Sequence, residues 1–278
     1  MENKVSPLQK YKRQPKLYID LPSKGVWFPK AQLDKAEQIE VYSMSANDEI
    51  GLKTPDALYT GIAVKRLIES CIPAIKDAWF VPLRDLDYIL ASIRLASYGE
   101  TIELTNICSN CENRDTYGLQ VQTMLEHLER AEVRYEVTIN NFNFKLRPLT
   151  YKEITDFQQE IFQIRRTIQQ VLSKMEEGEE KSKQTQDLYD RLREKTLITV
   201  AASVIEIVTP EGETETNTTF ISDFIINGDK DYYNGLQELY DTNQKKLKLP
   251  DTEVECSSCG NKTKLNPDLD YSNFFVRS

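Results

Sequence analysis

The sequence predicts an α+β protein, and two observations lead to that prediction. Two Cys-x-x-Cys turns, Cys108–Cys111 and Cys256–Cys259, lie far apart in the chain, and each is flanked by β-like runs. Apolar residues also recur every three or four positions before the first turn and again after Thr150, as they do on amphipathic helices. We therefore expect a mostly helical N-terminal part, a small β module like a zinc ribbon formed by the two distant knuckles, and a long antiparallel helical hairpin inserted between them.

The chain begins with a basic segment, residues 1–16, which we expect to be an extended arm. Two outcomes are open: a disordered tail, or an arm that becomes ordered on a neighbouring subunit. With 40% hydrophobic and 28% charged residues, the whole chain has the composition of a soluble globular protein. No apolar stretch approaches the ~18 residues of a membrane span. The first residues lack the apolar core of a signal peptide.

Residues 17–100 are predicted to form an N-terminal α+β domain. Alternating or apolar runs predict short strands at Leu17–Leu21 and Ile39–Tyr42. Ser45 is suited to cap the helix that follows, because its side chain can accept a hydrogen bond from a free backbone N–H of the first turn. Two more amphipathic helices follow, and the second is expected to end at Gly99, a residue that accepts a left-handed conformation.

The four paired cysteines predict a metal site. Cys108, Cys111, Cys256 and Cys259 supply four thiolates, the ligand set of a closed, tetrahedral structural zinc site, so Zn²⁺ is the expected cofactor. Disulfides and unbound thiols are the alternatives, and the sequence leaves open whether both pairs share one ion. If they do, the 144 residues between Cys111 and Cys256 become a loop closed by the metal. The fifth cysteine, Cys71, lies in an apolar helical run and is expected in the core.

No set of catalytic residues can be argued from the sequence. Four thiolates leave a zinc ion no open position for a substrate, and the single histidine, His127, stands near neither cysteine pair. The phosphate-binding, dinucleotide-binding, nucleophile-elbow and metalloprotease motifs are missing from the sequence. Asp85 and Asp87 are explained by the start of a helix. We therefore expect neither an enzyme nor a small-molecule substrate.

Residues 101–149 are predicted to hold the first zinc knuckle and a β-hairpin. Tyr135–Ile139 and Phe142–Leu146 alternate with period two around Asn140-Asn141, which is a strong hairpin signal. We expect the aromatic face of this hairpin to pack on the knuckle.

Residues 150–208 are predicted to form the helical hairpin. Thr150 and Glu153 have the spacing of a capping box, and apolar residues recur at helical spacing on both sides of the charged turn Glu176–Glu180. The apolar stripe could simply be core. The polar turn favours an arm that projects and docks a partner, because such a turn is costly to bury.

Residues 209–250 are predicted to be a helical segment. Residues 251–278 are predicted to contain the second zinc knuckle and the C-terminal tail. The tail contains the apolar run Phe274–Val276. We expect this run to be tucked against the protein, since an exposed run would be an interaction peptide.

The order of these features resembles the T4-type tailed-phage baseplate hub proteins, also described as baseplate hub assembly chaperones. The resemblance spans most of the chain and rests on Leu21-Pro22-Ser23-Lys24-Gly25, Met44-Ser45-Ala46-Asn47-Asp48-Glu49, the Leu86-Asp87 helix, Ser97-Tyr98-Gly99, Cys108-Ser109-Asn110-Cys111, Leu146-Arg147-Pro148-Leu149-Thr150 and the closing Cys-x-x-Cys. It implies a bacteriophage structural or assembly protein without catalysis, whose partners are other tail or baseplate hub proteins. Its implied location is the virion tail or baseplate, or the host cytoplasm during assembly.

Two other classes of protein also use Cys-x-x-Cys pairs. A zinc-ribbon nucleic-acid-binding or transcription-related protein would use Arg114, Lys262 and Lys264 near the knuckles, but the net charge of -9 argues against a nucleic-acid partner. Steeply salt-dependent DNA binding would favour it. A redox protein would have a low-pKa thiol and no metal.

Overall fold

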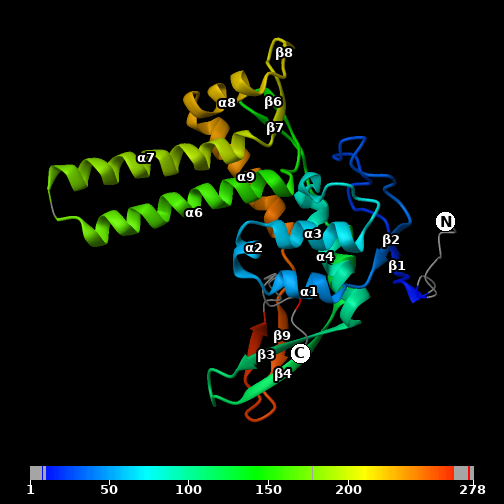
Figure 1. Ribbon diagram of the computed structural model, residues 1–278. Helices are drawn as coiled ribbons and strands as arrows, with labels where there is room; N and C mark the ends of the chain where they lie inside the picture. Colours follow the sequence, from blue (N-terminus) through cyan, green and yellow to red (C-terminus); the bar gives the residue numbers. More distant parts are fainter. Residues whose placement is uncertain (1–7, 9–10, 177, 266–274, 276–278) are drawn as a thin grey trace, which may run out of the picture. The chain divides into compact units, whose positions relative to one another are not determined.

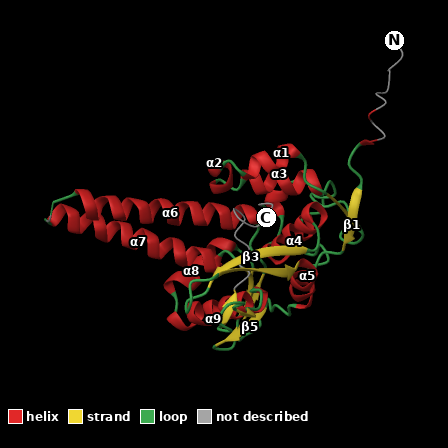
Figure 2. Cartoon of the chain, turned by 90° about the horizontal axis from the view of Figure 1, so that it is seen from below, coloured by secondary structure: helices red, strands yellow, loops and turns green. Residues whose placement is uncertain are grey.

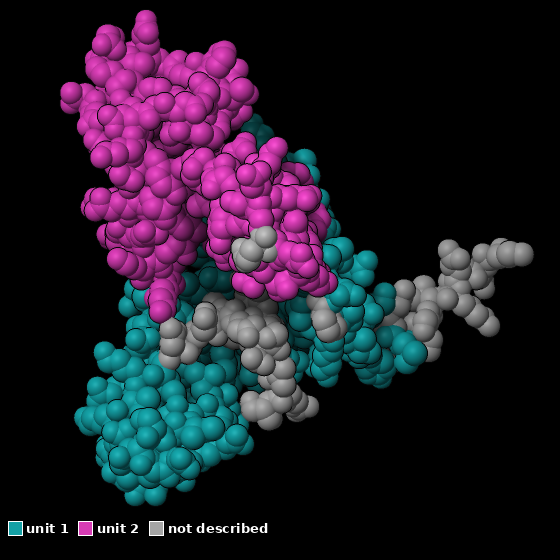
Figure 3. Space-filling model, turned by 90° about the vertical axis from the view of Figure 1, so that its left-hand side faces the viewer, with its two compact units in different colours: residues 1–78, 84–130, 249–278 teal, residues 79–83, 131–248 magenta. Residues whose placement is uncertain are grey.

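Helices and small antiparallel sheets make up the computed structural model, which describes residue 8 and residues 11–176, 178–265 and 275 (Figure 1). The predicted α+β fold class is confirmed. The chain divides into two compact units, coloured separately in Figure 3. Unit 1 comprises residues 1–78, 84–130 and 249–278, and unit 2 comprises residues 79–83 and 131–248. The finer division into six segments stays a prediction.

Unit 1 begins with a two-stranded sheet and several helices, as predicted. Strand β1 (Pro15–Ile19) pairs antiparallel with β2 (Ile39–Tyr42). The helices are α1 (Ala46–Leu52), α2 (Pro55–Tyr59), α3 (Ile62–Cys71) and α4 (Leu83–Tyr98). The 3-10 helix η2 (Ala78–Phe80) precedes α4, and its residues Trp79 and Phe80 belong to the segment 79–83 of unit 2. Their apolar stripes form a core in which these side chains are shielded from solvent: Leu67, Ile68, Cys71, Ile89, Leu90 and Ile93.

Helix α1 starts where the sequence predicts because Ser45 forms a capping box. Its hydroxyl accepts a hydrogen bond from the Asp48 N–H at 3.3 Å, and the Asp48 carboxylate accepts one from the Ser45 N–H at 2.7 Å. The same carboxylate accepts a bond from the Ser70 hydroxyl at 3.0 Å and lies 3.5 Å from the Arg13 guanidinium. Arg13 also donates to the Ser43 carbonyl oxygen at 2.7 Å. The end of the predicted arm is thus fixed to unit 1, while its residues 1–7, 9 and 10 lie outside the described residues.

The sequence explains Asp85 by the start of a helix, but in the structure this residue also binds a neighbouring turn. It is fully buried, and its carboxylate accepts hydrogen bonds from the backbone N–H of Ser23 at 2.9 Å and from the Ser23 hydroxyl. Burial raises the pKa of Asp85, and the two bonds from Ser23 oppose that change. The turn at Pro22–Gly25 is therefore tied to the start of α4.

The rest of unit 1 is a β module with one helix. Strands β3 (Thr101–Ile107) and β4 (Arg114–Gln120) form one antiparallel pair, and β9 (Thr252–Glu255) and β10 (Lys262–Leu265) form another. Helix α5 (Val121–Arg130) follows β4 directly. Of the predicted tail run, only Phe275 is described, and its side chain is buried. Phe274 and Val276 lie outside the described residues.

Unit 2 is built on a four-stranded antiparallel sheet. Its strands, in spatial order, are β5 (Glu136–Ile139), β6 (Phe142–Leu146), β7 (Val204–Val208) and β8 (Thr214–Glu215). One face of the sheet packs against α8 (Thr218–Asn227) and α9 (Lys230–Leu247), and Figure 1 shows α8 beside β6 and β7. Buried Phe144, Ile221 and Leu236 lie in this core.

The expected packing of the hairpin's aromatic face on the knuckle is wrong. The ring of Phe142 lies 5.4 Å from those of Phe224 and Tyr232, and Phe144 lies 5.8 Å from Tyr232, measured between centroids. The aromatic face is therefore covered by α8 and α9. The physical reason is that β6 pairs with β7 as well as with β5, which joins the hairpin to the sheet of unit 2.

The predicted helical hairpin is present as α6 (Tyr151–Lys174) and α7 (Glu179–Ala201). The two helices run side by side in Figures 1 and 2. Thr150 and Glu153 form the predicted capping box, and Arg147 donates hydrogen bonds to both carboxylate oxygens of Glu153. Between the helices lies a small cluster of buried Ile164, Ile168 and Leu188.

Candidate metal centre

The first Cys-x-x-Cys turn connects β3 to β4, and its local backbone is a closed knuckle. The backbone N–H of Cys108 donates to the Asn113 carbonyl oxygen, and the N–H of Glu112 donates to the Cys108 carbonyl oxygen, both at 2.9 Å. Glu112 takes a left-handed conformation, with φ of 58°. We define Cys108–Asn113 as the first knuckle.

The second turn connects β9 to β10 and repeats this geometry. The N–H of Cys256 donates to the Asn261 carbonyl oxygen, and the N–H of Gly260 donates to the Cys256 carbonyl oxygen, again at 2.9 Å. Gly260 has φ of 70°, a conformation that glycine adopts without strain. We define Cys256–Asn261 as the second knuckle. The two knuckles share the sequence pattern Cys-Ser-x-Cys-x-Asn.

The structure brings the four predicted ligand residues together. Their sulfur atoms all lie within 4.8 Å of one another, and the Cys108–Cys259 and Cys111–Cys256 sulfur pairs are each 3.6 Å apart. A disulfide would require an S–S distance of about 2.0 Å. Zinc–sulfur bonds of about 2.3 Å in a tetrahedron place the sulfurs about 3.8 Å apart. The geometry therefore fits one ion shared by both pairs.

The backbone around the sulfurs favours a thiolate at Cys108. Hydrogen bonds from the backbone N–H groups of Asn110 and Cys111 lower the pKa of Cys108 to about 6. The N–H of Asn113 acts in the same direction on Cys111, but the neighbouring thiols, Cys259 foremost, outweigh it and raise the pKa of Cys111 to about 12. Four sulfurs this close repel one another when ionised, so a cation is needed for all four to be thiolates together.

Burial differs between the two cysteines of each knuckle. Cys108 and Cys256, the first of each pair, are buried, whereas Cys111 and Cys259 are exposed. A bound ion would thus be covered by protein on one side and lie close to solvent on the other.

Sequence reasoning missed the polar residues around the sulfurs. The Asn113 side chain donates to the Cys256 sulfur at 3.9 Å, and the Asn261 side chain donates to the Cys108 sulfur at 3.8 Å, so each knuckle contacts a cysteine of the other. The repeat of Asn two positions after the second cysteine was a signal for this pair. Asp115 was missed as well. Hydrogen bonds from the side chain and the backbone N–H of Ser257 lower the pKa of Asp115.

A family model described as T4 bacteriophage base plate protein matches residues 35–276. The chain belongs to this family. The resemblance to T4-type baseplate proteins is thereby confirmed. No curated protein and no solved structure matches the chain.

The T4 base plate family match spans both cysteine pairs and the whole α6–α7 hairpin. It gives the protein a structural role in a phage baseplate. In the part of the chain that the structure describes, no helix combines the length and the apolar character needed to cross a membrane.

The other candidates in this base plate protein do not join the metal centre. Cys71 is buried in the helical core, as predicted, and its burial raises the pKa of the thiol to about 12. Among the described residues, the group of potential metal ligands contains the four paired cysteines and neither Cys71 nor His127.

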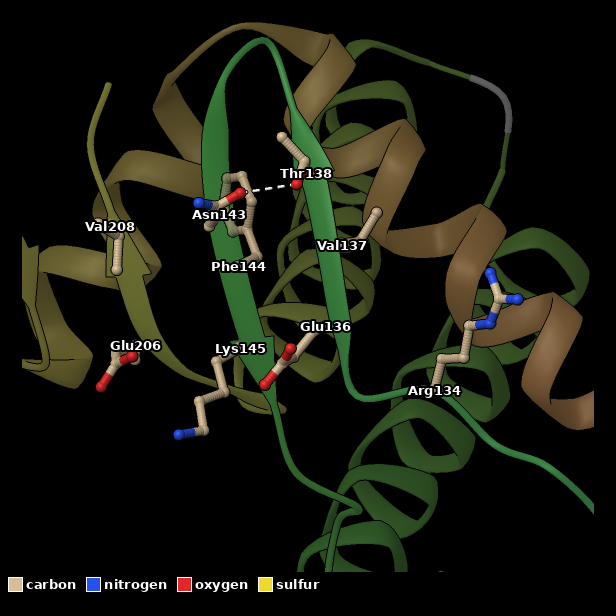
Figure 4. A pocket seen from close by; sticks show the side chains of 9 residues that line it. All are labelled: Arg134, Glu136, Val137, Thr138, Asn143, Phe144, Lys145, Glu206 and Val208. Carbon is tan, nitrogen blue, oxygen red and sulfur yellow. Dashed lines mark hydrogen bonds between the residues drawn. The ribbon is translucent and has the colours of Figure 1, made fainter. Parts of the chain in front are cut away.

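A shallow hollow lies on the sheet of unit 2 (Figure 4). Lys145 stands between Glu136 and Glu206 in the strand register, and the Thr138 hydroxyl donates to Asn143 at 2.6 Å. Such cross-strand pairs are ordinary for the polar face of a sheet.

Proposed function

We propose that this protein is a non-enzymatic structural or assembly protein of a tailed-phage baseplate hub. In this proposal a four-cysteine structural zinc staples the chain, and helical surfaces are presented to neighbouring hub subunits. The observation that carries it is the meeting of four sulfurs, from turns 144 residues apart in sequence, in a chain of the base plate family.

The proposed ligands are Cys108, Cys111, Cys256 and Cys259. Zinc bound to four thiolates supplies folding free energy and leaves no coordination position for a substrate. The chain leaves unit 1 after Arg130 and re-enters it at Leu249, so the covalent path through unit 2 starts and ends in the unit that holds the metal centre. The proposed zinc ion thus connects the two segments of unit 1 between which residues 131–248 of unit 2 are inserted.

The α6–α7 hairpin is the proposed surface for neighbouring subunits. Its own buried cluster is small, whereas Phe162, Leu172 and Tyr189 are 42–50% exposed. Exposed apolar and aromatic side chains on one hairpin are suited to interface contacts.

Native mass spectrometry of the full chain tests the metal part of the proposal. We expect one zinc ion per chain. Two half-occupied cysteine pairs bridged between chains, or a metal-free protein with oxidised pairs, would contradict it.

Quantitative mass spectrometry of infected cells tests the hub part. We expect the protein to co-purify with baseplate hub intermediates, and Phe162→Ser to weaken that co-purification. Arg166 is an exposed residue on the same helix, and the variant Arg166→Ser serves as the control for a change of surface side chain. Equal hub recovery for both variants would argue against the hairpin as the docking surface. The same measurement on purified virions separates a permanent component from a transient assembly factor.

A further inference from the structure

Beyond the four sulfurs, one carboxylate joins the two knuckles. Asp115 lies on β4, just after the first knuckle, and its Oδ2 accepts a hydrogen bond from the backbone N–H of Ser257 at 3.0 Å. Its Oδ1 accepts one from the Ser257 hydroxyl at 2.6 Å and one from the Asn113 side chain at 2.9 Å. We refer to the Asp115–Ser257 pair as the clasp. Ser257 directly follows Cys256, so the clasp fixes the position of that ligand relative to the first knuckle.

Two more side chains reinforce the clasp. The Asn113 side chain lies 3.3 Å from the Ser257 hydroxyl, and the Tyr117 hydroxyl donates to the Glu255 carbonyl oxygen at 3.0 Å. Over the described strands, β3–β4 and β9–β10 form separate two-stranded sheets with no ladder between them. The orientation of the two knuckles relative to each other therefore depends on side-chain contacts and on the sulfurs.

The clasp is present on one side of the metal centre only. The repeated pattern makes Ser109 equivalent to Ser257, and Thr263 equivalent to Asp115. Between Ser109 and Thr263, both within the described residues, there is no hydrogen bond. Threonine lacks the two acceptor oxygens with which Asp115 receives both the N–H and the hydroxyl of a serine. The Ser109–Thr263 pair is thus the equivalent of the clasp without its hydrogen bonds, and it provides an internal control.

We propose that Asp115 and Ser257 are positioning residues of the four-cysteine metal centre, an inference that rests on the metal binding proposed above. The clasp holds Cys256 beside Cys111, where the two sulfurs are 3.6 Å apart. Residues that hold metal ligands in the binding geometry raise affinity without touching the ion. The clasp therefore strengthens metal binding and slows metal release, and its removal acts on the Cys256 side of the centre.

Cobalt(II) is a suitable probe, because tetrahedral thiolate coordination gives this ion visible absorption bands. The full-length wild type and the variants Ser257→Ala, Ser257→Thr and Ser109→Ala are titrated against a competing chelator. We expect Ser257→Ala to bind cobalt at least about tenfold more weakly, as loss of an outer partner of a metal ligand typically does. Ser257→Thr keeps the hydroxyl and should bind within about twofold of wild type. Ser109→Ala, the matched exposed serine of the other knuckle, should bind like wild type.

The variant Asp115→Asn alters the other partner of the same contact. We expect it to weaken binding and to accelerate cobalt release to excess chelator. The double variant Asp115→Asn with Ser257→Ala should bind no more weakly than Asp115→Asn alone, because the two residues act through one contact. Circular dichroism of each metal-free variant separates a loss of metal positioning from a loss of fold, and if Ser257→Ala misfolds, Asp115→Asn takes its place.

Equal affinities for Ser257→Ala and Ser109→Ala would overturn the clasp while leaving the metal centre intact. Fully additive losses in the double variant would do the same. Absence of thiolate–cobalt bands in the wild type would overturn the metal proposal itself. The two failures are therefore distinguishable.

Discussion

Cys108 is the cysteine through which the metal proposal is most directly tested. It is buried, and backbone N–H groups favour its thiolate. We expect Cys108→Ser to lose most of its zinc and to unfold at a temperature several degrees lower, because structural metal binding contributes directly to folding free energy. Metal content by mass spectrometry and thermal unfolding by circular dichroism measure both effects.

Cys71→Ala is the matched control for that variant. Cys71 is also fully buried, but it lies in helix α3 and outside the group of paired cysteines. Its replacement should lower stability through lost packing while leaving the zinc content unchanged. A Cys108→Ser protein that keeps its zinc and its thermal stability would remove the basis for a structural metal.

Glu153 gives a prediction about pH. Burial alone would raise the pKa of this carboxyl, but hydrogen bonds from Arg147 and Thr150 prevail and lower it. A carboxyl whose folded pKa is lowered contributes stability that is present above its unfolded pKa, about 4.3, and that is lost as the pH falls through the folded value. Glu153→Gln should therefore cost roughly 1 kcal/mol at pH 7. Its penalty should shrink at about pH 3, as urea unfolding at both pH values would show.

Glu160 provides the comparison on the same helix. It pairs with Lys195 at 2.6 Å, but its side chain is half exposed, and such pairs contribute little. Glu160→Gln should change stability by less than about 0.5 kcal/mol at either pH. A Glu153→Gln penalty independent of pH would show that the Arg147–Glu153 pair does not carry the effect.

Helix α8 ends at a position that excludes a side chain. A Cβ on Gly228 would lie 2.3 Å from the Phe224 carbonyl oxygen, a backbone atom that cannot move aside as the tip of a side chain could. Its φ of -82° is ordinary, so the requirement is for space. Gly228→Ala should destabilise unit 2 by roughly 1–3 kcal/mol. Urea unfolding monitored through the fluorescence of Trp79, which lies in unit 2, measures this.

The control is the same substitution in a helix with room for it. A Cβ on Gly51, in α1, would meet nothing within 4 Å. Gly51→Ala should be neutral or gain up to about 1 kcal/mol from helix propensity. If both variants behave alike, the close approach at Gly228 is without energetic consequence.

Helix starts were predictable because their signals are local. Ser45 and Thr150 each bond a residue three positions later, so the cap at Ser45 and the capping box at Thr150 could be recognised in the sequence. The partner of the aromatic hairpin face could not be recognised in this way. Phe142 meets Phe224, 82 positions away, and no pattern near either residue specifies that contact.

The candidate metal centre shows the same limit across the whole molecule. Cys-x-x-Cys spacing indicated the four candidate ligands, because each pair is a local turn. It could not show that Cys108 faces Cys259 while Cys111 faces Cys256, nor that Asp115 bonds Ser257 from 142 positions away. Those pairings depend on how the two knuckles meet, which only the tertiary structure determines.

The division into two units predicts how metal removal acts on the whole protein. All four proposed ligands belong to unit 1, and the described part of unit 2 has its own buried core. An ion that binds only the folded state stabilises it by about 4 kcal/mol when the free metal exceeds Kd about 1,000-fold. Chelation should therefore destabilise unit 1 and leave the unfolding of unit 2 nearly unchanged.

The two tryptophans make this measurable, since Trp27 lies in unit 1 and Trp79 in unit 2. Trp79 stacks on Tyr151 with ring centroids 5.3 Å apart, so its fluorescence reports on the packing of unit 2. In a Trp79→Phe variant, chelator should shift the thermal transition seen by Trp27 downwards by several degrees. In a Trp27→Phe variant, the transition seen by Trp79 should stay within about one degree. Equal shifts for both probes would mean that the metal stabilises the two units as one cooperative body, because a ligand stabilises only what must unfold to release it.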